Sequence, residues 1–240
     1  MVETLERMGA ARSPAVVRAF RTVPRHVFVP DASLERAYSA DLAIATRTTA
    51  DGIPISSSSA PSIMSAMLEP LEVAPGMRVL EVGTGTGYNA AILAELVGPA
   101  GHVTTVELDP SLAATARARL AALGATVDVL TGDGWEGAAR TAPYDRVIVT
   151  AGVSDLSRAW VEQLRDGGRL VVPLWLGPGL QLPVTFERCG ERLDSRNVDW
   201  CGFMPLRGEH AGADARSSPA NGSSTWRTAR TPTPASCATS

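Results

Sequence analysis

Residues 79–88 read Val79-Leu80-Glu81-Val82-Gly83-Thr84-Gly85-Thr86-Gly87-Tyr88, an apolar strand that ends in three alternate glycines and opens onto a helix. Glycines at such a turn let the backbone come very close to a bound nucleotide. The next predicted strand, 102–107, ends in Glu107, and a carboxylate about 20 residues after the glycines is where a doubly wound fold holds ribose hydroxyls. The pattern predicts a ligand of the adenosine type; the alternative is a tight turn that binds nothing.

The glycine spacing also distinguishes between classes of nucleotide site. The dinucleotide fingerprint would place glycine at position 88, where this chain has Tyr88. No lysine follows the glycines, because the chain contains none, and this excludes a phosphate-binding P-loop. Three alternate glycines followed by an aromatic residue resemble instead the loop of S-adenosylmethionine-dependent methyltransferases.

From residue 77 onward, predicted strands alternate with predicted helices. The strands are expected at 77–82, 102–107, 127–131, 144–150 and 169–174, and the helices at 88–97, 110–123 and 156–165. Such alternation indicates a mostly parallel, twisted sheet with helices on both faces. Leu182–Phe186 and Arg192–Val198 flank Cys189-Gly190 and predict an antiparallel C-terminal hairpin. The expected fold class is therefore α/β, and the resemblance of the glycine loop implies a Rossmann-like class I methyltransferase.

Three regions are expected along the chain. Residues 1–75 form an N-terminal helical and substrate-loop region, in which Pro24 and Pro30 exclude helix between them and 39–61 is a long loop. Residues 76–207 form the S-adenosylmethionine-binding core. Residues 208–240 are expected to be a disordered tail, because Ser, Thr, Ala, Pro and Gly dominate them and bury too little apolar surface.

The composition of the chain limits the classes of partner and ligand that it is expected to bind. The 240 residues carry a formal charge of -3, without the basic surplus typical of nucleic-acid binding. The three cysteines, Cys189, Cys201 and Cys237, are odd in number and widely spaced, which predicts neither a disulfide framework nor a zinc site. With no signal layout and no membrane-length apolar stretch, we expect a reduced, cytoplasmic, monomeric protein without bound metal, nucleic acid or membrane.

Several blocks resemble protein-L-isoaspartate O-methyltransferases. The blocks most specific to this family are Val23-Pro24-Arg25-His26-Val27-Phe28-Val29-Pro30 and Gly132-Asp133-Gly134; the others are Ala37-Tyr38, the 83–88 loop, Ala142-Pro143-Tyr144-Asp145 and 164–173.

The resemblance implies roles for the cofactor residues: Glu107 is expected at the ribose and Asp133 at the adenine amino group, although Asp beside Gly also favours a plain turn. Glu81 is expected to fix the glycine loop through backbone N–H groups. The full predicted cofactor set is Glu81, Gly83, Thr84, Gly85, Gly87, Tyr88, Glu107, Leu108, Gly132, Asp133 and Gly134.

Family members carry a Thr-Ile-Ser-Gln-Pro segment whose serine is associated with the place where methyl donor and substrate meet. With Pro61 as the reference, Ser59 takes the position of that serine and Ala60 replaces the glutamine. The resemblance implies that Ser59 is the catalytic residue and orients the substrate. Ser58 is also expected in contact with substrate, and His26 is expected either to contact substrate or to make a structural hydrogen bond. The alternative for the stretch Ser56–Ser59 is a helix N-cap plus linker, a role that suits Ser58 better than Ser59.

The resemblance implies an S-adenosylmethionine-dependent enzyme that methylates an isoaspartyl or aspartyl carboxylate in a protein or peptide. Such a carboxylate, with a reference pKa of about 3.9, is already ionised at neutral pH, so positioning can replace a general base. The methyl ester then loses methanol to a backbone amide and forms a succinimide. Three alternatives remain: maturation of Asp in a ribosomally made peptide, whose enzymes the Ser-rich segment and 201–207 resemble, a non-catalytic adenosyl-binding module, and a small-molecule methyltransferase.

Overall fold

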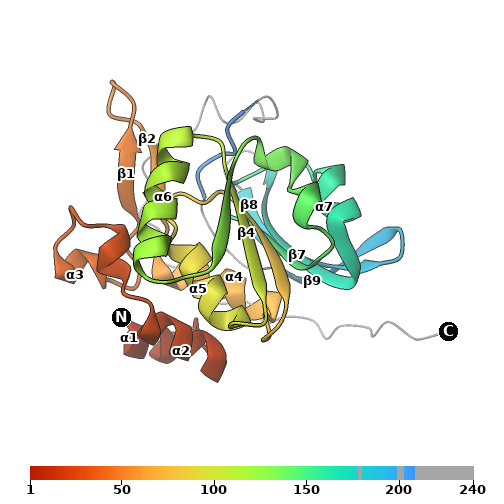
Figure 1. The fold of residues 1–240 in the computed structure, drawn as a ribbon, viewed down its shortest axis with the longest axis horizontal. Coiled ribbons are helices and arrows are strands. Elements are labelled where there is room, and N and C mark those ends of the chain that lie inside the picture. Colours follow the sequence, from red (N-terminus) through yellow and green to blue (C-terminus); the bar gives the residue numbers. More distant parts are fainter. Residues whose placement is uncertain (178–179, 199–202, 209–240) are drawn as a thin grey trace.

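A seven-stranded sheet with the strand order β5-β4-β3-β6-β7-β8-β9 forms the centre of the protein (Figure 1). The computed structural model describes residues 1–177, 180–198 and 203–208. The strands are β3 (Arg78–Val82), β4 (His102–Glu107), β5 (Val127–Thr131), β6 (Tyr144–Val149), β7 (Leu164–Gly177), β8 (Leu180–Cys189) and β9 (Arg192–Val198). The strands from β5 to β7 pair in parallel, whereas β8 pairs antiparallel with both of its neighbours. The predicted mostly parallel sheet with an antiparallel hairpin is confirmed.

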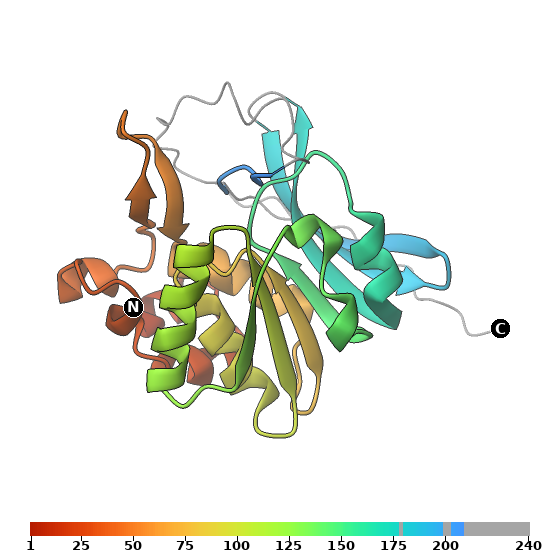
Figure 2. The ribbon, with the colours of Figure 1, turned by 45° about the horizontal axis from the view of Figure 1, so that its top comes forward.

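Helices cover both faces of this sheet, because successive side chains of a strand point to opposite faces. Val79 of β3 belongs to one buried apolar cluster and its neighbour Leu80 to the other. The first cluster includes residues of α1 (Val2–Arg7), α2 (Pro14–Thr22), α4 (Pro61–Leu71), α5 (Tyr88–Val97) and α6 (Pro110–Ala122). The second includes the fully buried Trp160 of α7 (Arg158–Gln163) (Figure 2).

The N-terminal helices share their core with the sheet. Leu5 of α1 and Phe20 of α2 lie in the same cluster as Val79 and Val103. After α2 come one 3-10 turn, η1 (Arg25–Phe28), and the short helix α3 (Leu34–Ala37). The prediction that Pro24 and Pro30 exclude helix was therefore wrong, since a single 3-10 turn fits between them with Pro24 at its N-cap.

The predicted long loop at 39–61 is wrong, because most of it forms a β-hairpin. Strands β1 (Ile44–Thr48) and β2 (Pro54–Ser58) pair antiparallel, with Ile44 opposite Ser58, and stand away from the main body in Figures 1 and 2. Arg47 ties the hairpin to the start of α6 by pairing with Asp109 and donating to Ser111 Oγ over 2.6 Å. These strands carry mostly Ser, Thr and Arg, so backbone pairing forms them without an apolar alternation in the sequence.

Smaller differences concern the end of the core. Helix α7 is shorter than the predicted 156–165, because Leu164 is already extended and begins β7. Two further 3-10 turns, η2 (Gly134–Glu136) and η3 (Ala139–Thr141), follow β5. The predicted disordered tail lies outside the described residues apart from Gly208. Within the described ranges no helix is both long and apolar enough to cross a membrane.

Candidate active site

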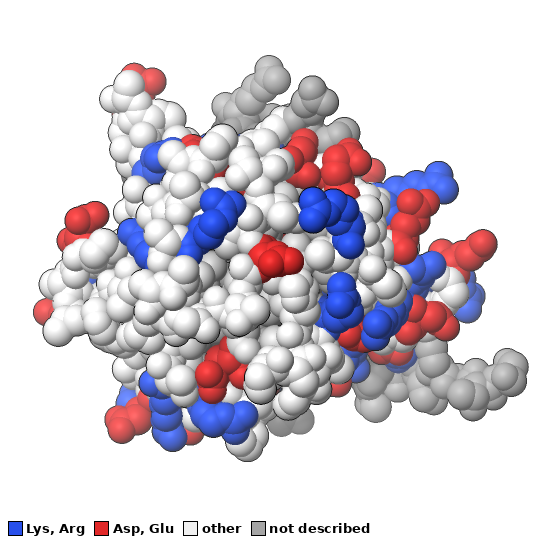
Figure 3. Space-filling view, in the orientation of Figure 1, with Lys and Arg blue, Asp and Glu red and all other residues white. Residues whose placement is uncertain are grey.

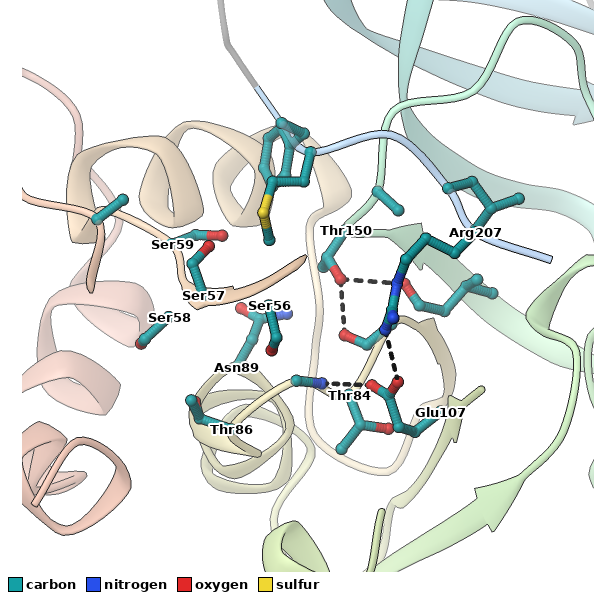
Figure 4. A pocket seen from close by; sticks show the side chains of 18 of the residues that line it. Ser56, Ser57, Ser58, Ser59, Thr84, Thr86, Asn89, Glu107, Thr150 and Arg207 are labelled. Carbon is teal, nitrogen blue, oxygen red and sulfur yellow. Dashed lines mark hydrogen bonds and ion pairs between the residues drawn. The ribbon is translucent and has the colours of Figure 1, made fainter. Parts of the chain in front are cut away.

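A cavity of about 550 Å³ opens at the carboxyl ends of the parallel strands, the usual ligand position in open α/β sheets. It lies beside β3, where the strand order turns from β4 on one side to β6 on the other. Figure 4 shows the serines of β2 on one side and Glu107 and Arg207 on the other. Further parts of the wall come from α4, the start of α5, the end of β6, Trp175 and residues 203–207.

The glycine loop, residues 83–87, lines part of the cavity with its backbone. Gly83 and Gly85 line it and have φ values of +97° and +53°, a region that side chains disfavour. A Cβ on Gly83 would lie 2.6 Å from Thr150 Oγ1, which itself donates to the carbonyl of Gly83 over 2.7 Å. The loop therefore needs glycine for both conformation and space.

Glu107 is held at the edge of the cavity by its own hydrogen bonds. One carboxylate oxygen accepts from the Gly85 N–H over 2.8 Å, and the other accepts from the Asp109 N–H over 3.1 Å. Arg207 Nη2 lies 3.9 Å from the same carboxylate. The group is fixed in direction before any ligand arrives, with its neighbour Leu108 also lining the cavity.

Glu81 lies beneath the loop and does not line the cavity. It is fully buried and accepts hydrogen bonds from Thr105 Oγ1 over 2.6 Å and from Asn89 Nδ2 over 2.8 Å. Burial raises the pKa of Glu81 to about 7; the two hydrogen bonds oppose this shift and the charge of Glu107 adds to it. Glu81 thus supports the site through the side chains of Thr105 and Asn89, which corrects the expectation of contacts to backbone N–H groups.

The serine segment forms the opposite wall. Ser56, Ser57, Ser58 and Ser59 all line the cavity, and a Cβ on Gly85 would lie 3.5 Å from the Ser57 carbonyl. The N-cap of α4 is Ala60, without a side-chain cap bond, so the helix-cap alternative for Ser58 is wrong. The buried Ser58 hydroxyl has no hydrogen-bond partner among the described residues.

Four other predicted residues lie outside the lining of the cavity: His26, Gly87, Gly132 and Asp133. His26 Nδ1 is 2.8 Å from the Tyr38 hydroxyl in an exposed pair. Asp133 accepts from the Trp135 N–H over 2.9 Å and caps η2, the turn role given as its alternative. The predicted residues that do line the cavity are Ser58, Ser59, Gly83, Thr84, Gly85, Tyr88, Glu107, Leu108 and Gly134.

Some lining residues were missed from the sequence. Thr150 directly follows β6, so its place at the carboxyl end of a parallel strand could have indicated it. Asn89 sits one residue inside α5, and Trp175 near the end of β7; no motif marks either. Across the part of the chain that the structure describes, no cluster of His, Cys, Asp or Glu could hold a metal ion.

Comparison with known proteins identifies the family. The family model described as protein-L-isoaspartate(D-aspartate) O-methyltransferase matches residues 1–211. The chain belongs to this family. A protein-L-isoaspartate O-methyltransferase of Methanothermobacter thermautotrophicus is 41% identical over 212 residues, covering 88% of this chain and 94% of the relative. One of Methanopyrus kandleri is 42% identical over 212 residues, covering 87% and 90%.

Solved structures agree with this family assignment. A protein-L-isoaspartate O-methyltransferase superposes with a TM-score of 0.78 at 31% identity, covering 87% of this chain and 65% of that longer chain. A Plasmodium falciparum protein in complex with S-adenosyl-L-homocysteine has the same fold, with a TM-score of 0.70 at 20% identity, covering 86% and 96%. The predicted family, fold and methyltransferase class are confirmed.

Proposed function

We propose that this methyltransferase transfers a methyl group from S-adenosylmethionine to the free carboxylate of an isoaspartyl residue in a protein or peptide. The proposal rests on the observation that two groups of residues line opposite sides of the same cavity. Glu107 and the glycine loop form one wall, and Ser56–Ser59 form the other. The names of the two relatives described above, both protein-L-isoaspartate O-methyltransferases, support the same substrate.

The residues present fit S-adenosylmethionine. The Glu107 carboxylate, already oriented by the Gly85 N–H, would accept from the two ribose hydroxyls. The backbone of Gly83 and Gly85 leaves room for the ligand beside it. Asn89 Oδ1 is buried at this wall without a hydrogen-bond partner in the described ranges, which leaves one acceptor for a ligand donor. Gly134 lines the cavity, and we assign it to the adenine end; Gly132 and Asp133 precede it outside the lining, where Asp133 caps the turn that positions Gly134.

The chain's own groups are suited to catalysis by positioning. S-adenosylmethionine supplies a methyl group on a positively charged sulfur. The substrate carboxylate is ionised at neutral pH and needs orientation rather than a base. The Ser59 hydroxyl would donate to one oxygen of that carboxylate and leave the other free. Met64, Met67 and Trp175 line the same cavity and would exclude water around the reacting atoms.

The test is a methyl-transfer assay followed by mass spectrometry. An isoaspartyl peptide is compared with the same peptide carrying Asp, and Ser59→Ala is run beside the wild type. We expect methylation of the isoaspartyl peptide, little of the Asp peptide, and slower turnover in the variant. Methylation of only the Asp peptide would move the function to peptide maturation. Binding of S-adenosylhomocysteine without methyl transfer to either peptide would contradict the proposal and favour a non-catalytic adenosyl-binding module.

The proposal also covers the location, the oligomeric state and the partners of the enzyme. We assign it to the cytoplasm as a monomer, with a protein or peptide substrate and without nucleic-acid or membrane partners. The formal charge of -3 supports the proposed absence of a nucleic-acid partner, as do the interspersed charges on the face in Figure 3, because nucleic-acid binding needs a concentrated basic surface. Sedimentation of the purified protein tests the oligomeric state.

A further inference from the structure

Arg25 in η1 is a fully buried cation behind the serine wall of the cavity. No carboxylate lies within ion-pair distance of its guanidinium among the described residues. Burial lowers the pKa of Arg25, against an opposing effect of Tyr88. Burying an unpaired charge is costly, and an apolar side chain of similar size would fill the same space without that cost. Packing alone therefore does not explain why a positively charged side chain occupies this buried position.

The contacts of Arg25 join the two walls of the site. Its Nη2 donates to the carbonyl oxygens of Ser59 over 2.9 Å and Ser58 over 3.3 Å. Its guanidinium carbon lies 5.0 Å from the centre of the Tyr88 ring, and Tyr88 directly follows the glycine loop and lines the cavity. Nη1 lies 3.7 Å from Met64 Sδ, another lining residue. One planar group thus touches the serine segment, α4 and α5.

We infer that Arg25 is a positioning residue for methyl transfer, one that sets the backbone of Ser58 and Ser59 and so aims the Ser59 hydroxyl into the cavity. This inference rests on the proposed function, in which Ser59 orients the substrate carboxylate. Ser58 ends β2, where it pairs with Ile44, and Ser59 lies between β2 and α4, whose N-cap residue Ala60 makes no side-chain cap bond. The two bonds from Arg25 therefore hold the chain where it passes from strand to helix. A guanidinium holds its donors in a rigid planar fork, whereas a lysine ammonium is a compact charge on a flexible stem, so lysine would hold the two carbonyls less rigidly.

The first test compares Arg25→Lys with the wild type and with Arg117→Lys. Arg117 donates to the Val129 carbonyl over 2.7 Å and lies outside the cavity lining, so it controls for a lost guanidinium–carbonyl bond. Turnover of an isoaspartyl peptide is measured per S-adenosylhomocysteine-binding site. Arg25→Lys should lower kcat about tenfold or more, because small misplacements of a reacting group cost at least that, while product affinity changes little. Arg117→Lys should change neither.

A double variant tests whether Arg25 acts through Ser59. If it does, Arg25→Lys should cost less than about twofold in kcat when introduced into Ser59→Ala, since coupled residues are not additive. A full, additive loss in that background would overturn the inference. Loss of S-adenosylhomocysteine binding in Arg25→Lys would also overturn it, because Arg25 would then be holding the fold as a whole.

Hydrogen–deuterium exchange supplies a readout that does not depend on turnover. In Arg25→Lys, exchange in residues 54–60 should become faster while residues 83–87 keep their wild-type rate; Arg117→Lys should alter neither segment. Unchanged exchange in 54–60 would refute the positioning role. If the wild type itself does not methylate isoaspartyl peptides, the proposed function fails, and the exchange result still decides whether Arg25 sets the serine segment.

Discussion

Replacing Glu81 by Gln should flatten the pH dependence of stability between about pH 4.5 and pH 7. Burial raises the pKa of Glu81 from 4.5 to about 7. Across this interval the folded protein keeps a proton on Glu81 that the unfolded chain has lost. Since the folded state binds more protons there, the free energy of unfolding decreases as the pH rises. Below the interval both states are protonated, and above it both are ionised, so the contribution of Glu81 is constant outside it.

The magnitude follows from the two pKa values. The span from 4.5 to about 7, at about 1.4 kcal/mol for each pKa unit, corresponds to about 3 kcal/mol. Glutamine has almost the same shape and no charge. Its amide oxygen can accept from Asn89 in place of the carboxylate oxygen. Its amide nitrogen can donate to the Thr105 hydroxyl, which can turn toward Thr84 Oγ1, 2.7 Å away.

The measurement is urea denaturation of wild type and Glu81→Gln at intervals from pH 4.5 to pH 8. We expect the stability of the variant, relative to the wild type, to improve by about 3 kcal/mol as the pH rises through this range. Glu35→Gln removes one exposed carboxylate and serves as the control. Parallel stability profiles for wild type and Glu81→Gln would show that Glu81 ionises normally in the folded state, and the reasoning from its burial would be wrong.

Glu107→Ala should weaken binding of S-adenosylhomocysteine by about 1.5–3 kcal/mol; an unchanged calorimetric affinity would remove Glu107 from the site. Ser59→Ala should lower kcat about tenfold or more with nearly unchanged product affinity, whereas Ser62→Ala, outside the cavity lining, should not. Gly83→Ala should lose stability to backbone strain of about 1–2 kcal/mol and also to the clash with Thr150 Oγ1. Gly98→Ala, at φ +62° with open space, should show strain alone in the same urea titration.

Local sequence was enough for much of the fold. The alternation of strands and helices from Arg78 to Val198 follows from apolar runs separated by glycine and polar turns, and each predicted strand appears within a few residues of its place. The cavity-lining part of the glycine loop and Glu107 could also be predicted, because a parallel sheet brings the carboxyl ends of its strands to one edge.

Tertiary structure decided the rest. The β1–β2 hairpin has almost no apolar alternation; its strands pair through their backbones, and Arg47 ties it to Asp109. Asp133 and His26 sit in sequence blocks that resemble the family, yet neither lines the cavity. In the folded chain the Asp133 carboxylate accepts from the Trp135 N–H, and His26 Nδ1 lies beside the Tyr38 hydroxyl.

The sequence by itself therefore determined the α/β sheet and the family, which follow from local patterns repeated along the chain. It also determined the glycine–acid part of the site, which lies within one strand–loop–strand unit. Only the folded chain places Arg25 behind Ser58 and Ser59 and Glu81 beneath Asn89. Arg25 reaches across 33 and 34 residues to those carbonyls. Burial, and with it the raised pKa of Glu81, is a property of the assembled core, which no local pattern of residues specifies.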